Sequence, residues 1–184
     1  SGPIINSISF KIATLKHSQD GFRKNKFTNS GNSNGKDEFF IRTKILWNLM
    51  SNLSISLMNF NSNLNNKYDI WAPDNNQELN TYTNNQGMDS QKSNSYAMII
   101  NLPEIKGLKS KIKLNMSHTN SVHSYDGDWA NNNYWLENHG FDSEIEGWSY
   151  EFWDEMNRKR LVNTSEIHLN STENLILPFD SKII

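Results

Sequence analysis

The feature that most constrains this chain is a two-residue alternation of apolar and polar side chains. In residues 39–47 the odd positions are mainly apolar, while Arg42 and Lys44 occupy even positions. Residues 53–57 and 111–117 repeat the pattern, with Leu, Ile or Met alternating with Ser, Lys or Asn. Because successive side chains of a β-strand point to opposite faces, each segment is predicted to form a strand with one apolar and one polar face.

The connections between these segments are alternately short and long. Tight connections lie near Leu49 and Gly107, whereas residues 13–38, 61–95 and 122–161 form long polar loops. In an antiparallel meander this order places every long loop at one end of the sheet. A soluble β-sandwich has no reason for that asymmetry, but transmembrane barrels have short periplasmic turns and long extracellular loops. The sequence therefore predicts an all-β antiparallel meander that forms part of a transmembrane β-barrel.

The composition is compatible with that interpretation. Only every second residue of a barrel strand faces lipid, so no long apolar run is needed. A formal net charge of −2 gives no support to nucleic-acid binding, and the lack of Cys excludes disulfides and thiolate metal sites. The chain begins at Ser1 without a signal peptide, and Ile183–Ile184 resembles the opening of a further strand. We therefore expect residues 1–184 to be a fragment of a barrel domain.

Residues 1–22, 36–55, 125–129 and 164–169, taken together, resemble stretches of the barrel of TonB-dependent outer-membrane receptors. Residues 1–22 are similar to the first barrel strands of that family, with a small-Gly-Pro-Ile entry. Residues 36–55 resemble its strand-turn-strand hairpin, and residues 125–129 resemble the Tyr-Asp-x-Asp-Trp stretch where a strand enters an extracellular loop. Residues 164–169 resemble a descending strand of the family, with His168 in the place that Arg usually holds.

The resemblance implies a plugged, 22-stranded barrel, of which this chain would supply about six strands. It implies a place in the bacterial outer membrane and energy-coupled uptake of a scarce solute, with ferric siderophores the commonest in the family and haem, cobalamin and oligosaccharides the alternatives. The implied partners are outer-membrane lipid, the solute and the TonB complex, which acts through a plug domain absent from this chain. Uptake of this kind is a conformational process, so neither an enzyme nor a cofactor is expected.

The third predicted loop is rich in aromatic residues, which are candidates for contact with the solute. They are Trp129, Tyr134, Trp135, Trp148, Tyr150 and Trp153. The alternative interpretation is loop packing together with an aromatic girdle, which barrels carry at both membrane boundaries. We favour this second interpretation.

Six polar residues of the predicted strands are interpreted as facing the barrel lumen. They are Arg42, Lys44, Lys111, Lys113, Glu166 and His168. A charge on the lipid face at mid-bilayer would cost about 2–4 kcal/mol, whereas in the lumen it can be hydrated or paired.

No metal site or catalytic residue is predicted. Asp126 and Asp128 lie near His123 and His139, but their spacing matches neither a calcium loop nor a zinc site. The acidic residues of the third loop are accompanied by no nucleophile motif or phosphate-binding loop. The alternative for the whole chain is a soluble, secreted β-sandwich that binds carbohydrate through loop aromatics and Asn or Asp side chains.

Overall fold

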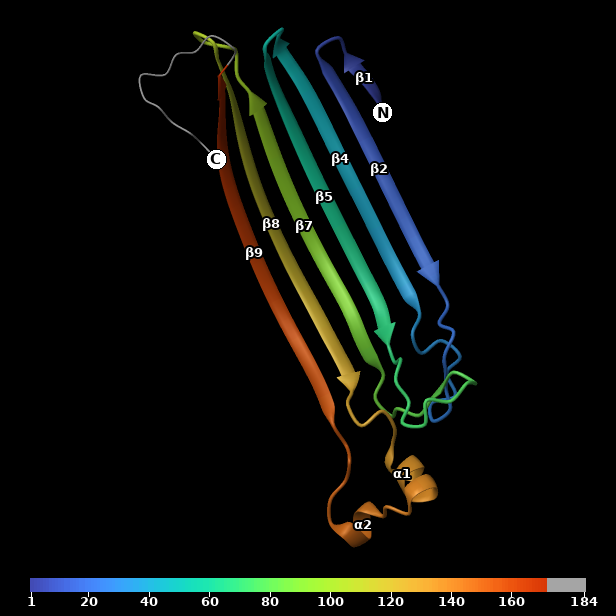
Figure 1. The fold of residues 1–184 in the computed structure, drawn as a ribbon. Helices are drawn as coiled ribbons and strands as arrows, with labels where there is room; N and C mark the ends of the chain where they lie inside the picture. The colour runs from blue at the N-terminus through green and yellow to red at the C-terminus, as the bar shows by residue number, and fades with distance from the viewer. Residues whose placement is uncertain (172–184) are drawn as a thin grey trace.

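The computed structural model describes residues 1–171 of the chain. Seven strands form one antiparallel sheet in the order β1-β2-β4-β5-β7-β8-β9 (Figure 1). Their bounds are Gly2–Ile5 (β1), Ile8–Gln19 (β2), Lys36–Met50 (β4), Leu53–Tyr68 (β5), Gly87–Asn101 (β7), Leu108–Asp126 (β8) and Trp153–Ser171 (β9). The predicted all-β antiparallel meander is thus confirmed, with seven strands instead of about six. The described sheet is open, with β1 and β9 at its edges, and is not a closed barrel. The expected strand opening at Ile183–Ile184 lies outside the described residues.

The long loops lie together at one end of the sheet and the short turns lie at the other (Figure 1). The loops are residues 20–35, 69–86 and 127–152, and the turns are residues 6–7, 51–52 and 102–107. The predicted asymmetry is confirmed, but the predicted loops were too long. The strands continue into the loop end through segments in which both faces are polar, such as residues 89–95 of β7, where no alternation is visible in the sequence.

Short strands and short helices lie within the loops. The strands β3 (Lys24–Asn25) and β6 (Asn80–Thr81) pair in parallel and join the first loop to the second. The third loop contains the helices α1 (Asn132–His139) and α2 (Ser143–Glu146), which the sequence analysis missed. No helix within residues 1–171 is long and apolar enough to cross a membrane.

The caps of these helices follow from the sequence. Asn131 precedes α1 and its side chain accepts a hydrogen bond from the Tyr134 N–H, while Gly140 ends the helix with a φ of 66°. In the same way, Asp142 is the N-cap of α2 and Gly147 is its C-cap. Asn and Asp are preferred N-cap residues because their side chains accept backbone N–H groups of the first turn, and Gly commonly ends a helix because it adopts the left-handed region without strain.

The strand register sorts the side chains into rows that run across β2, β4, β5, β7, β8 and β9. On one face, here called the apolar face, four successive rows begin at the turn end. Row 1 is Ile8, Trp47, Ile55, Ile100, Ile112 and Ile167; row 2 is Phe10, Ile45, Leu57, Met98, Leu114 and Ser165; row 3 is Ile12, Thr43, Asn59, Tyr96, Met116 and Asn163; row 4 is Thr14, Ile41, Asn61, Asn94, His118 and Leu161. None of the four rows contains Asp, Glu, Lys or Arg.

The sheet has no hydrophobic core on either side. Among residues 1–171 the buried apolar side chains are Ala130 and Tyr134, and both lie in the third loop. On the apolar face Ile12 is 54% exposed and Ile167 is 72% exposed. The described strands therefore form a single layer, and the two packed sheets of the alternative β-sandwich prediction are wrong for this part of the chain.

Candidate functional site

The first and second loops are joined by a buried polar network centred on Asp69. The Asn25 amide donates hydrogen bonds to the Asp69 carboxylate (3.1 Å) and to the Thr83 backbone carbonyl (2.9 Å). The Thr81 hydroxyl donates to the same Asp69 oxygen at 2.8 Å. All four residues are buried, and burial raises the pKa of Asp69, although hydrogen bonds from Thr81 and Asn25 oppose that shift.

Contacts between aromatic rings join the second loop to the third. The rings of Tyr82 and Tyr134 lie 4.5 Å apart, and Trp71 stacks on Trp129 with the ring centres 5.9 Å apart. The Asn131 amide, which follows Ala130 in the chain, donates a hydrogen bond to the Tyr82 carbonyl. The three long loops thus form one connected unit, which we call the loop cluster (residues 20–35, 69–86 and 127–152).

Four of the six predicted contact aromatics belong to one network of rings. Tyr134 meets Trp135 edge to face at 5.5 Å, and Trp135 lies 4.8 Å from Tyr150. Trp148 also lies 4.8 Å from Tyr150. Phe141, which the sequence analysis did not single out, packs on both Trp148 (4.7 Å) and Tyr150 (4.6 Å). These contacts agree with the packing interpretation, while Trp148 and Tyr150 remain exposed on their outer sides.

The other two predicted aromatics lie apart from this network. Trp129 stacks on Trp71 of the second loop, which the sequence analysis did not identify. Trp153 was placed in the third loop but is the first residue of β9, where it pairs with Asp126. No ring contact of Trp153 is found within residues 1–171. The structure therefore brings together only part of the predicted aromatic set.

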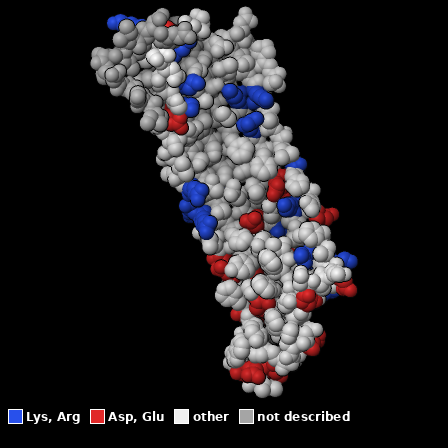
Figure 2. Space-filling view, in the orientation of Figure 1, with Lys and Arg blue, Asp and Glu red and all other residues white. Residues whose placement is uncertain are grey.

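The third loop and the strand ends next to it are strongly acidic. Between Leu114 and Asn157 the chain has no Lys or Arg, and its acidic residues in that interval are Asp126, Asp128, Glu137, Asp142, Glu144, Glu146, Glu151, Asp154 and Glu155. Figure 2 shows the outermost part of the loop end with red acidic side chains and no blue ones. The loop cluster therefore presents an aromatic surface with negative charge.

Asp126 and Asp128 form a carboxylate pair at the loop end of β8. Asp126 is 4% exposed, and one of its oxygens accepts the Asn85 N–H at 3.2 Å. One Asp128 oxygen accepts the Trp135 indole N–H at 3.2 Å. Burial and the hydrogen bond with Asp128 raise the pKa of Asp126 to about 8, so this carboxyl keeps its proton to a higher pH than an exposed Asp does. Within residues 1–171, no group of three or more His, Asp or Glu side chains could hold a metal ion.

The six residues predicted to face a lumen share one face of the sheet, opposite the apolar face. On this polar face Arg42 and Lys44 come from β4, and Lys111 and Lys113 from β8. Glu166 joins two of the others, since its carboxylate lies 3.2 Å from the Lys113 ammonium and 2.7 Å from the His168 ring. Lys11 of β2, which pairs with Lys44, belongs to the same face and was missed by the sequence analysis.

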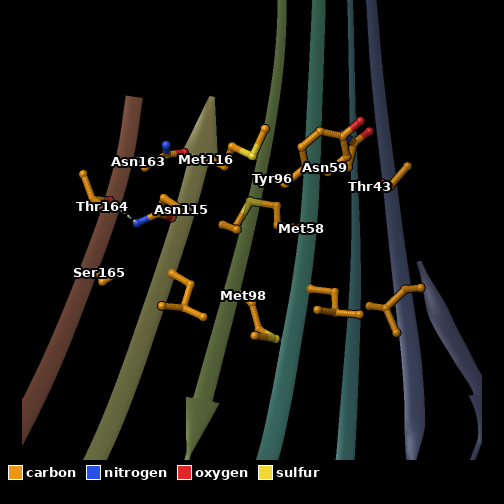
Figure 3. A pocket seen from close by; sticks show the side chains of 14 residues that line it. Thr43, Met58, Asn59, Tyr96, Met98, Asn115, Met116, Asn163, Thr164 and Ser165 are labelled. Atoms are coloured by element: carbon orange, nitrogen blue, oxygen red, sulfur yellow. Dashed lines mark hydrogen bonds between the residues drawn. The ribbon is translucent and has the colours of Figure 1, made fainter. Parts of the chain in front are cut away.

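A shallow groove of about 450 Å³ crosses the apolar face (Figure 3). The side chains on its floor and sides come from β4, β5, β7, β8 and β9. They include Ile45, Leu57, Tyr96, Met98, Leu114 and Met116. Asn59, Thr43 and Asn163 lie at its loop-side end, in row 3. The groove is thus apolar toward the turn end and polar toward the loop end.

Comparisons with protein-family models, with curated proteins and with solved structures give no match to this chain.

Proposed function

We propose that this chain forms part of the barrel wall of a TonB-dependent outer-membrane receptor that takes up a scarce solute. The observation that carries the proposal is the absence of charge from rows 1 to 4 of the apolar face. On the other face of the same strand segments lie Lys11, Arg42, Lys44, Lys113 and Glu166. Because a charge on a lipid-exposed face costs about 2–4 kcal/mol at mid-bilayer, this distribution favours lipid on one side and water on the other.

The dimensions of the sheet support the proposal. A tilted strand needs about 9–11 residues to cross a bilayer, and β4, β5, β7, β8 and β9 have 15 to 19 residues. Each strand is therefore long enough to cross the membrane and continue beyond it toward the loop cluster. In this arrangement the short turns lie in the periplasm and the loop cluster lies outside the cell.

The edges of the sheet support membership of a larger barrel. An open sheet in a bilayer leaves unpaired N–H and C=O groups along β1 and β9, and each unsatisfied group in hydrocarbon costs several kcal/mol. Further strands on both sides would pair these edges and close a barrel, which we take to be of the 22-stranded class. The polar face would then line the lumen and contact a plug.

The loop cluster is the proposed first contact for the solute. Exposed rings such as Trp148 and Tyr150 offer flat apolar surface, and the surrounding carboxylates favour a solute with cationic or hydrogen-bond-donor groups. A ferric siderophore is the proposed solute, and haem, cobalamin or an oligosaccharide are the other outcomes. Uptake then proceeds through TonB-driven movement of the plug, without bond chemistry.

Uptake in cells tests the proposal. The gene that encodes this chain would be expressed in a Gram-negative host lacking its own siderophore receptors, and accumulation of a panel of labelled solutes would be measured with and without TonB. The proposal expects protein in the outer-membrane fraction and accumulation of one solute that requires TonB. Recovery of the protein in soluble form, with binding to oligosaccharides, would instead support the carbohydrate-binding alternative.

A further inference from the structure

The row that follows the charge-free rows of the apolar face is basic. In row 5, Lys16 of β2, Lys92 of β7 and Lys159 of β9 point to the same face as rows 1 to 4. Phe39, Asn63 and Asn120 occupy the strands between them. Row 5 contains no acidic residue. The apolar face therefore changes abruptly from uncharged to positively charged along a line across the sheet.

The depth of this line matches a membrane boundary. Row 5 lies eight residues along each strand from row 1, which is about 27 Å at about 3.4 Å per residue. With a strand tilt of about 40°, the height along the membrane normal is about 21 Å, close to the roughly 25 Å of the apolar band of barrels. If row 1 lies at the periplasmic edge of the hydrocarbon, row 5 lies at the outer edge, where lipid headgroups begin.

The lysines are available to an external anion. Lys92 and Lys159 are exposed and make no hydrogen bond or ion pair with any residue of the described chain. They are two strands apart, about 10 Å at about 4.8 Å per strand. Lys16 forms an ion pair with Asp37 of the next row, and its side chain is 57% exposed. The row thus offers at least two free ammonium groups at a spacing that one headgroup can bridge.

The groove on the apolar face lies where the tail of such a lipid would run. Its polar end, at Asn59 and Asn163, is in row 3, which is about 14 Å along the strand from row 5. Its apolar part, at Leu57 and Met98, lies one row deeper. A positive row followed inward by an uncharged groove is complementary to an amphiphile with an anionic head and a hydrocarbon tail.

We propose that Lys16, Lys92 and Lys159 bind the phosphate groups of a lipid of the outer leaflet, with an acyl chain of that lipid in the groove. This inference rests on the proposed function, since it requires the sheet to lie in the outer membrane. Phosphate is the expected partner because the ammonium groups of lysine act as point charges toward phosphate oxygens. Each lysine near an anionic surface is expected to contribute about fivefold to the affinity.

Lipid retention provides the test. The protein as its gene encodes it would be reconstituted into phosphatidylcholine nanodiscs containing lipid A, or lipid A from which the phosphates have been removed, and the retained lipid would be measured by native mass spectrometry. We expect preferential retention of the phosphorylated form, and at least a tenfold loss in the K16Q/K92Q/K159Q variant. The K11Q/K44Q/R160Q variant removes the same charge from the polar face of the sheet and is expected to retain the lipid.

The other outcomes of this experiment separate failure of the lipid site from failure of the proposed function. Equal retention of both lipids, or equal loss in the two variants, would overturn the lipid site while leaving the outer-membrane proposal in place, since the protein would still reside in the bilayer. Groove occupation by a second copy of the protein, seen as a dimer without retained lipid, would also overturn it. Failure of the wild-type protein to enter the nanodisc would overturn both proposals.

Discussion

The sheet and the loop cluster are stabilised in different ways. The sheet is held by regular ladders between neighbouring strands, yet none of the apolar side chains of its strands is buried among the described residues. In the loop cluster, Asn25, Asp69 and Thr81 are buried and hydrogen-bonded to one another, and Tyr134 packs between aromatic rings. The loop cluster therefore contains its own packing, whereas the described residues leave the apolar face of the sheet uncovered.

The largest expected effect comes from charge on the apolar face. Leu57→Arg or Leu114→Arg should lower the yield of inserted protein, because each places a cation in row 2 at a cost of about 2–4 kcal/mol. The neighbouring substitutions Ser56→Arg and Asn115→Arg face the other side and should be tolerated. Yield would be measured in the outer-membrane fraction as protein with heat-modifiable mobility. Equal losses at both positions of each pair would mean that the faces are misassigned.

A buried polar substitution should affect the loop cluster and leave the sheet intact. Asp69→Ala removes the acceptor shared by Asn25 and Thr81, and leaves their donors buried without that partner at a cost of about 1–3 kcal/mol. Hydrogen exchange should therefore rise in residues 20–35 and 69–86 and remain unchanged in the strands. Asp20→Ala, an exposed change in the same first loop, is the control and should have no effect. Faster exchange throughout the sheet would show that the two regions are coupled.

The pH should act on the loop cluster through Asp126. Its pKa is raised from 3.8 to about 8, so the folded cluster binds more protons than the unfolded one between these values. The stabilisation is therefore complete below about pH 4 and is lost as the pH rises through about 8. The denaturant concentration at which the tryptophan fluorescence reports unfolding should therefore fall as the pH rises from about 4 to about 8.

The Asp126→Asn variant isolates this effect. It keeps an oxygen that can accept the Asn85 N–H but removes the titrating group, so its stability should depend less on pH. If the stability of the wild-type protein and of the variant depended on pH in the same way, the Asp126–Asp128 pair would not be the cause of the pH dependence of the loop cluster.

The smallest expected effect concerns the aromatic network. Tyr150→Ala removes ring contacts with Trp135, Phe141 and Trp148, and aromatic pairs contribute about 0.5–1.5 kcal/mol each beyond their burial. Local opening of the third loop, measured by limited proteolysis, should increase. Trp153→Ala, which removes an aromatic residue without ring contacts in the described chain, should not change cleavage. A larger effect of Trp153→Ala would contradict the contacts described for the cluster.

The sequence predicted the sheet better near the turns than near the loops. In β4 and β8 the alternation around Arg42, Lys44, Lys111 and Lys113 is regular because one face is apolar and the other is charged. The loop half of β9 begins Trp-Asp-Glu-Met-Asn-Arg, with no such contrast, and it was assigned to a loop. Where both faces of a strand are polar, the sequence shows no two-residue period. The loop-side ends of the strands could therefore not be located.

The candidate site was only partly predictable. The composition of the third loop indicated an aromatic cluster, and the Asn131 and Gly140 caps could have indicated α1. The hydrogen bond between Asn25 and Asp69 joins residues 44 positions apart in the chain, and the stack of Trp71 on Trp129 joins the second loop to the third. Contacts of this kind depend on the register of the intervening strands, which local patterns do not specify.

A lipid-accessibility scan along β8 would test directly whether one face of the sheet contacts lipid and the other contacts water. The chain has no Cys, so single cysteines can be placed at each position from Ile112 to Thr119 and spin-labelled in the membrane-inserted protein. We expect even positions to be accessible to oxygen dissolved in the bilayer, and odd positions to be accessible to a water-soluble nickel reagent. Accessibility to the aqueous reagent at every position, or a profile without a period of two, would contradict this expectation.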